Sequence, residues 1–500
     1  MEHEIEVIND RNVWELVPKP NNTKILGNRW VYTIKKDEKG HILRYKARLV
    51  AKGYTQLKGV SYDEVFSPVV NFGIVRLFFS IFVSYYKWMH YQLDIKNAYL
   101  YAPLNNEVYM YQPKGFENPD KPNHVCLLKK ALYGLHQSGR EWFFEIHSIL
   151  KSINFKNLKW VNCVYYYKNN VILLLYVDDI VIFGKTDEHI NEVISLLQTN
   201  FDLKLLGKTK KLLGVNFEEI NGNLVLHQED YITTVFQKFK SYNPPIASLP
   251  VTKGTMFSKQ QSPKTEAEIE EMSNFPYRSL IGCLAFIASR TRPDISFIVN
   301  LLSQFQANPG RLHWEALLKV LGYVYYSRNY KLNLYKINNI SLKYFSDASF
   351  ADNVDDRSST SGLIIFLDEV PIFWGTRKQR HITLSTMESE LVALTDAVKE
   401  AKWMMNIFKE MKKRDILQED AEHNVFCDNL ATINFSKSPI ENIRTKHIHI
   451  RYLFIRDLIY KKLFNLKYIN SKNNLADIFT KPLNKFEIRK FVSYIYYNVS

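Results

Sequence analysis

The chain of 500 residues has few cysteines, and the four present, Cys126, Cys163, Cys283 and Cys427, form no Cys-x-x-Cys pair. This spacing argues against a zinc ribbon or a disulfide framework and favours a reducing, intracellular compartment. Long apolar runs are also missing, because the longest candidate, residues 77–86, is about half of the ~20 residues that a membrane span needs. It predicts a core helix. The acidic first residues make a signal peptide unexpected.

Positive charge and aromatic residues are abundant instead. The formal net charge is +15, and tyrosine and phenylalanine number 31 each. An apolar fraction of 46% and a charged fraction of 23% indicate a folded protein, and the length suffices for two to four domains. Basic charge attracts phosphate backbones and aromatic faces stack on bases. The alternative, in which lysines solubilise the surface and aromatic residues fill the cores, explains the composition equally well.

Two adjacent acids, Asp178 and Asp179, lie between the apolar runs 171–177 and 180–183. The runs predict two buried strands joined by a hairpin that turns at the acidic pair. Charges are costly between buried flanks unless a cation is bound there, and carboxylate oxygens suit Mg²⁺. Aspartate is also a common turn residue, so an ordinary turn is the more frequent explanation for an isolated pair.

A third acid, Asp94, ends the strand-like alternation of residues 90–95. Three converging carboxylates can hold two Mg²⁺ ions ~3.5–4 Å apart, which clamp the attacking and leaving oxygens of a phosphoryl transfer. Two adjacent turn residues cannot point equally well at one pair of metal ions, so we expect Asp178 to be the main ligand of the two and Asp179 the secondary one.

These motifs resemble those of reverse transcriptases. Tyr176-Val-Asp-Asp179 resembles their signature hairpin, and residues 92–100 resemble their first aspartate motif. Further segments match the copia-like branch of LTR retrotransposon Pol polyproteins: 46–56, 66–70, 132–142, 277–282 and 290–296. The matches are collinear over nearly the whole chain, which coincidence does not explain. The resemblance makes the three aspartates the metal-binding catalytic carboxylates of a polymerase.

The resemblance also implies substrate-binding residues. Lys46 and Arg48 would meet the nucleotide triphosphate, Arg48 through bidentate contacts. Tyr99 would stack against the incoming sugar and exclude a ribose 2′-hydroxyl, and Gln137 would line the nucleotide pocket. Tyr99 as a core aromatic residue, and the two cations as solvated charges, are the plain alternatives.

Four further acids lie where the RNase H domain of the same elements has its metal ligands: Asp347, Glu390, Asp428 and Asp477. Their oxygens would hold a second pair of Mg²⁺ ions that activate water for attack on an RNA phosphodiester. Glu388 competes with Glu390 for the helical position. Because Glu388 has the spacing of a capping-box residue, we assign the metal to Glu390 and keep Glu388 as the alternate.

The fold that the resemblance implies is an α+β right-hand polymerase with fingers, palm and thumb, followed by an α/β RNase H-like domain. A stretch rich in proline, serine and lysine near residues 243–264 predicts an exposed linker. The expected domains are fingers and palm at 1–242, linker with thumb or connection helices at 243–337, the RNase H-like domain at 338–485, and a tail at 486–500.

The activity implied is RNA-directed DNA synthesis with two Mg²⁺, or Mn²⁺, per active site, and an RNase H that degrades the RNA strand of RNA/DNA hybrids. Expected partners are an RNA template, a DNA primer and product, dNTPs, a second copy of the chain, and the element's integrase and capsid proteins, with no membrane. The expected location is a cytoplasmic virus-like particle, or the nucleus. The family's protease and integrase would lie upstream of this segment. The alternative is a catalytically inactive genomic remnant or a co-opted nucleic-acid-binding protein.

Overall fold

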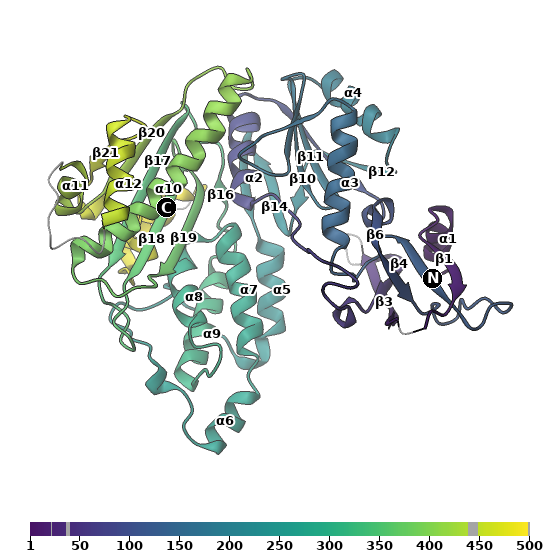
Figure 1. Cartoon of the computed structure of the whole chain (residues 1–500). Coiled ribbons are helices and arrows are strands. Elements are labelled where there is room, and N and C mark those ends of the chain that lie inside the picture. Colours follow the sequence, from purple (N-terminus) through teal and green to yellow (C-terminus); the bar gives the residue numbers. More distant parts are fainter. Residues whose placement is uncertain (22, 37–40, 439–448, 499–500) are drawn as a thin grey trace. The chain divides into compact units, whose positions relative to one another are not determined.

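The computed structural model describes residues 1–21, 23–36, 41–438 and 449–498. They form two compact units, shown within Figure 1. The first unit consists of Met1–Val70 and Met89–Lys208, and the second of Asn71–Trp88 and Thr209–Ser500. The domain boundaries expected from the family pattern stay predictions, because they follow homology rather than compactness.

The N-terminal part of the first unit is built on a four-stranded sheet and a long two-stranded ribbon. The sheet has the order β1 (Trp14–Pro18), β7 (His124–Lys130), β6 (Pro103–Met110) and β2 (Ile25–Leu26). Helix α1 (Glu2–Asp10) contributes Ile8 to a core that it shares with Leu49 and Met110. The ribbon pairs β3 (Asn28–Lys36) with β4 (Ile42–Ala51), and a short 3₁₀ turn, η1 (Gly53–Thr55), follows it.

A six-stranded antiparallel sheet forms the rest of the first unit. Its order is β12 (Leu203–Gly207), β5 (Met89–Ile95), β11 (Asp179–Gly184), β10 (Val171–Tyr176), β9 (Val164–Tyr167) and β8 (Lys156–Asn157). Strands β10 and β11 are buried almost throughout, as their apolar runs predict. Helices α3 (Ser138–Ser152) and α4 (Asp187–Gln198) belong to the same unit, and η3 (Ala98–Tyr101) follows β5. Helix α4 buries Ile190, Val193 and Leu197 at helical spacing and contacts β11.

The second unit includes α2 (Phe72–Phe78) and the π-helical segment η2 (Phe79–Tyr85). Residues of the first unit separate this segment in sequence from the rest of the second unit. A small antiparallel sheet follows, ordered β13 (Lys211–Leu212), β14 (Val215–Ile220), β15 (Asn223–His227) and β16 (Leu332–Asn333). A helical core lies beside it, made of α5 (Glu229–Lys238), α6 (Glu266–Ser273), α7 (Tyr277–Arg290), α8 (Ser296–Ser303) and α9 (Arg311–Tyr326). The prediction of a core helix at 77–86 is confirmed, in π-helical form for most of its length.

Many residues of the stretch 243–264 are exposed, as predicted, Ile246 and Met256 among them, but the stretch is anchored to the helical core. Val251 and Phe257 are buried in the helical core. The carbonyl oxygen of Pro245 lies so near Gly322 of α9 that an added Cβ would stand 1.7 Å from it. Sparse apolar residues therefore suffice to hold this stretch against the helices, although its composition resembles that of a loop.

A five-stranded mixed sheet completes the second unit. Its order is β19 (Val370–Lys378), β18 (Thr360–Leu367), β17 (Ser341–Ser349), β20 (Glu422–Cys427) and β21 (Asn465–Tyr468). The first three strands are antiparallel, and β20 and β21 join in parallel. Helix α10 (Thr386–Lys413) packs on β17, β18 and β20, and α11 (Leu430–Lys437) and α12 (His449–Tyr460) contact α10 (Figure 1).

The end of the chain, expected as a tail, is helix α13 (Lys485–Ile495) with a buried last turn. The Tyr496 hydroxyl donates to Asp294 at 2.6 Å and to the Thr291 carbonyl at 3.1 Å. The Asn333 amide donates to the Ile495 carbonyl at 2.8 Å. None of the described helices is both long and apolar enough to cross a lipid bilayer. The sheets and helices of the two units confirm the predicted fold class, an α+β region followed by a mixed α/β sheet with its helices.

Candidate active sites

The acidic hairpin of the first unit is displaced by one residue from the turn that the sequence predicts. The residues between the strands are Val177 and Asp178, while Asp179 already begins β11, opposite Tyr176. Val177 has a φ of 56°, which is strained for a β-branched residue. The Trp142 indole donates to the Val177 carbonyl at 2.7 Å. Packing of α3 therefore holds a turn that the local sequence would not choose alone.

Asp94 and Asp179 are direct partners across β5 and β11. The Ile95 amide donates to the Asp178 carbonyl at 2.9 Å, so all three acids lie at one end of the sheet. Burial raises the pKa of Asp179 to about 6, although the Gln92 amide donates to its carboxylate at 3.2 Å; repulsion from the other two acids adds to the rise. Burial and the Asp178 charge also raise the pKa of Asp94. Such mutual repulsion is what a bound cation would relieve.

Three cations surround this acidic end. Lys204 of β12 is the strand partner of Asp94, on the side opposite β11. Its charge, with those of Lys46 and Arg48 on β4, opposes the rise in the pKa of Asp94. The structure thus brings both predicted triphosphate-binding residues within electrostatic reach of the acids. Lys204 was not predicted, because the pairing of β12 with β5 depends on residues more than a hundred positions apart.

The aromatic residues beside Arg48 form a small cluster. The Arg48 guanidinium lies 4.7 Å from the ring centre of Tyr133, and Tyr99 meets the same ring edge-on at 5.2 Å. Tyr99 is half-buried, and its pKa is raised by burial and by the Asp178 charge. Its position near the acids is compatible with a sugar contact, but its role as a steric gate stays a prediction.

Gln137 lies apart from these groups in a buried network. Its amide oxygen accepts from Gln56 at 3.0 Å, and its amide nitrogen donates to the Ser61 carbonyl at 2.9 Å. The Gln56 side chain also accepts from the His136 amide at 2.9 Å. These bonds join two distant segments of the first unit, and direct contact of Gln137 with a nucleotide stays a prediction.

The four acids predicted in the C-terminal region come together in the second unit. Asp347 lies on β17, Asp428 follows β20, Asp477 begins η9 (Asp477–Phe479), and Glu390 lies on α10. The ligand atoms of Asp347, Asp428 and Asp477 are all within 4.8 Å of one another. Glu390 joins Asp428 and Cys427 in a second group with the same limit. Among the described residues, only these two groups meet that distance, so Asp94, Asp178 and Asp179 are more widely spaced.

Burial and mutual repulsion dominate the electrostatics of this cluster. They raise the pKa of Glu390 to about 9 and that of Asp477 to about 7, and they raise the pKa of Asp347 as well. Glu390 accepts from the Ala348 amide at 3.2 Å, and Asp347 accepts from the Thr480 hydroxyl. One oxygen of Glu390 and one of Asp477 are buried with no hydrogen-bond partner. Buried acceptors of this kind fit oxygen-ligated cations such as Mg²⁺.

Lys481 is a member of this site that sequence reasoning missed. Its ammonium lies 3.0 Å from Asp477 and 3.8 Å from Asp347. The two carboxylates raise its pKa against the effect of burial. A lysine four residues after Asp477 was visible in the motif, but only the fold shows that it reaches Asp347 as well.

Glu388 and Glu390, the two candidates for the helical position, have different contacts, and the metal role of Glu390 stays a prediction. Glu388 accepts from the Leu384 amide at 2.7 Å, and its own amide donates to the Ser385 hydroxyl at 3.2 Å. These are the contacts of a helix cap. Glu390, two residues further along α10, is the one whose side chain joins the acid cluster.

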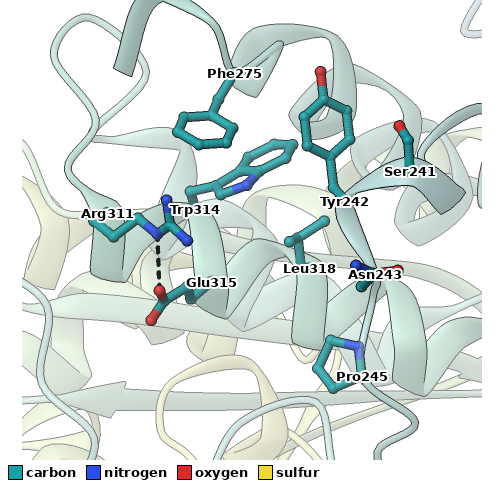
Figure 2. A pocket seen from close by; sticks show the side chains of 9 residues that line it. All are labelled: Ser241, Tyr242, Asn243, Pro245, Phe275, Arg311, Trp314, Glu315 and Leu318. Carbon is teal, nitrogen blue, oxygen red and sulfur yellow. Dashed lines mark hydrogen bonds and ion pairs between the residues drawn. The ribbon is translucent and has the colours of Figure 1, made fainter. Parts of the chain in front are cut away.

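A pocket of about 390 Å³ lies elsewhere in the second unit, between α9 and the stretch after α5 (Figure 2). Trp314, Phe275 and Tyr242 supply aromatic walls, with ring centres 5.2–5.9 Å apart. Arg311 binds Glu315 at 2.9 Å along its edge. None of the predicted site residues lines this pocket, so it is separate from both acid clusters.

Residues 11–253 match the family model described as reverse transcriptase (RNA-dependent DNA polymerase). The retrovirus-related Pol polyprotein from transposon TNT 1-94 of Nicotiana tabacum is 36% identical over 98% of this chain and 37% of its own length. The corresponding polyprotein from transposon RE1 of Arabidopsis thaliana is 34% identical over 99% of this chain and 33% of its own length.

The chain thus spans about a third of the length of the curated relatives it matches. Among solved structures, a foamy viral protease-reverse transcriptase in complex with double-stranded DNA covers 94% of this chain and 82% of its own, at 14% identity and a TM-score of 0.47. A second foamy viral structure, of the form designated dRH, has a TM-score of 0.49 at the same identity, covering 94% of this chain and 70% of its own.

Proposed function

Because the chain belongs to the reverse transcriptase family of copia-like retrotransposon Pol polyproteins, we propose that it copies RNA into DNA by two-metal nucleotidyl transfer. The observation that supports this most directly is the register of Asp94 against Asp179, with Asp178 in the adjoining turn. All three offer carboxylate oxygens, which suit Mg²⁺ and also accept Mn²⁺. When bound, two such ions would acidify the primer 3′-hydroxyl and neutralise the triphosphate.

The residues around these acids have roles that follow from their charges. Lys46 and Arg48 bind the triphosphate of an incoming dNTP, and Arg48 is oriented by the Tyr133 ring that it stacks on. Tyr99 packs beside the same ring and limits the room for a ribose 2′-hydroxyl. Gln137 acts through Gln56, by holding the loops of the nucleotide pocket. The substrates are an RNA template and a DNA primer.

The C-terminal acid cluster has a second role in this proposal, the hydrolysis of the RNA strand in RNA/DNA hybrids. Asp347, Glu390, Asp428 and Asp477 would hold two Mg²⁺ ions, and the unpartnered oxygens of Glu390 and Asp477 favour this assignment. Lys481 would hold Asp347 and Asp477 in place while the site is free of metal. The alternative of an inactive remnant predicts missing metal carboxylates, and all seven acids are present.

Assembly and location are proposed on the family relation alone. The chain would act as a homo-oligomer or together with the integrase and capsid proteins of its element. Its place would be a cytoplasmic virus-like particle, or the nucleus.

Two assays on the same purified chain test the two activities. Primer extension on poly-rA/oligo-dT with Mg²⁺ measures the polymerase, and cleavage of a labelled RNA/DNA hybrid measures the RNase H. Asp178→Asn is expected to lower extension by about 100-fold or more and to spare cleavage, and Asp428→Asn to do the reverse. Asp120→Asn, in an exposed loop of the first unit, is the matched control.

The outcomes separate the alternatives. Extension that survives Asp178→Asn contradicts the polymerase site, and cleavage that survives Asp428→Asn contradicts the RNase H site. If the unmodified chain shows neither activity, the inactive remnant is the better explanation.

A further inference from the structure

Cys427 lies inside the C-terminal acid cluster but has no role in the proposed hydrolysis. It ends β20, is fully buried, and is a free thiol. Its sulfur shares a group with one oxygen each of Glu390 and Asp428, in which all ligand atoms lie within 4.8 Å of one another. The other group, Asp347 with Asp428 and Asp477, contains oxygen atoms alone. Asp428 belongs to both.

The two groups differ in the cations that they can select. An all-oxygen set suits Mg²⁺, whereas a thiolate selects Zn²⁺ and other thiophilic cations, with carboxylates completing the set. Sulfur and oxygen ligands of one tetrahedral Zn²⁺ lie roughly 3.5 Å apart, so the group would contract by at most about 1.3 Å to close around an ion. The lack of Cys-x-x-Cys pairs excludes a zinc ribbon but leaves this mixed set open.

The buried carboxylate of Glu390, which also belongs to the proposed Mg²⁺ set, indicates that a ligand belongs here. The Glu390 side chain is 4% exposed, and its Oε2 is buried with no hydrogen-bond partner, while Oε1 accepts from the Ala348 amide. Leaving a buried acceptor without a hydrogen-bond partner is unfavourable, because the lost contacts with water are not replaced. A cation held between Glu390, Cys427 and Asp428 would remove that cost.

We propose that Glu390, Cys427 and Asp428 form a binding site for a thiophilic divalent cation, Zn²⁺ or Cd²⁺, which blocks the hydrolytic site by taking Asp428 from the all-oxygen set. On binding, the Cys427 thiol and the protonated Glu390 carboxyl each release a proton to solvent, and the sulfur and a carboxylate oxygen form bonds to the metal. The binding step is independent of any activity. The inhibition rests on the proposed RNase H function.

Cd²⁺ titration of the metal-free full chain tests the binding step, because a thiolate bound to Cd²⁺ absorbs in the ultraviolet. The unmodified chain is expected to develop this absorbance with one equivalent of Cd²⁺. Cys427→Ser is expected to lose it. Cys283→Ser, which removes a half-exposed thiol of α7, is the matched control and is expected to keep it. Glu390→Gln tests a second ligand without touching the thiol and is expected to weaken binding by about 10-fold or more.

Three results would overturn the site: no absorbance in the unmodified chain, absorbance that survives Cys427→Ser, or unchanged affinity in Glu390→Gln. The last comparison decides the matter even if Cys427→Ser fails to fold.

Hybrid cleavage at fixed Mg²⁺ with increasing Zn²⁺ tests the inhibition. Cys427→Ser is expected to need about 10-fold more Zn²⁺ for half inhibition, relative to its own rate without Zn²⁺. Equal sensitivity of both proteins would refute inhibition through this thiol. Absence of cleavage with Mg²⁺ alone would instead refute the proposed RNase H function, and the Cd²⁺ absorbance would still decide the site.

Discussion

Replacing Arg76 by alanine is expected to destabilise the second unit strongly. Arg76 lies on α2 and is 3% exposed. Its Nε donates to the Ile372 carbonyl of β19 at 2.8 Å, and its Nη1 donates to the carbonyls of Arg290 and Ser289 of α7 at 2.7 and 3.2 Å. The guanidinium lies 3.8 Å from the ring centre of Trp374. One side chain therefore joins α2 to a strand and a helix more than two hundred residues away.

The magnitude follows from what the alanine would leave behind. A buried acceptor without its donor costs about 1–3 kcal/mol. The alanine would leave the Ile372, Arg290 and Ser289 carbonyls without the donor that Arg76 supplies. The lost side chain also leaves a cavity. Burial of a guanidinium lowers the pKa of Arg76 well below its usual value, so its removal recovers some desolvation energy. The expected net loss is about 3–5 kcal/mol of unfolding free energy.

Equilibrium urea denaturation, followed by tryptophan fluorescence, measures this loss. The matched control is Arg377→Ala on the same strand β19, whose side chain is 74% exposed and whose ion pair with Asp396 is 3.7 Å long. That variant should change stability by about 0.5 kcal/mol or less. Arg76→Lys should recover little, since an ammonium cannot bridge the same carbonyls as a planar guanidinium. If Arg76→Ala is as stable as Arg377→Ala, the inferred role of this buried cation is wrong.

Three further predictions concern charged and buried groups. The pKa of Asp179 is raised to about 6 from 3.8, so the folded chain binds that proton more tightly than the unfolded chain and loses stability as the pH rises through this window. Asp179→Asn should therefore abolish primer extension yet raise the melting temperature of the metal-free chain at pH 8. An unchanged or lower melting temperature would contradict the proposed charge repulsion. Because the pKa of Glu390 is raised to about 9, Mg²⁺ binding to the C-terminal cluster should release protons at pH 7. Calorimetry of Mg²⁺ binding in two buffers of different ionisation enthalpy should then give different heats. Equal heats would refute the proton release. Tyr496→Phe removes the buried hydroxyl contacts with Asp294 and Thr291, and should lower the unfolding free energy measured by urea denaturation by about 1–3 kcal/mol. Tyr497→Phe, at a half-buried position, should lower it less. Equal effects would argue against anchoring of the chain through the Tyr496 hydroxyl.

Many residues of the two candidate sites could be predicted from the sequence because their positions depend on local sequence patterns. Long apolar runs on both sides of Asp178 and Asp179 required buried strands joined by a tight turn, and the structure has that hairpin. The capping-box spacing of Glu388 predicts a structural contact at the start of the helix, and the structure has that contact. Neighbouring residues are sufficient for such features, since periodicity and capping depend on a few adjacent positions.

The partners across strands and between distant segments were decided by tertiary structure alone. Lys204 opposite Asp94, Lys481 between Asp347 and Asp477, and the one-residue shift of the acidic turn depend on strand register and loop packing. The same holds for α2, which precedes the Asp94 strand in sequence but packs into the second unit through Arg76. These contacts join residues far apart in the chain, so no local pattern records them, and only the burial of the folded cores selects them.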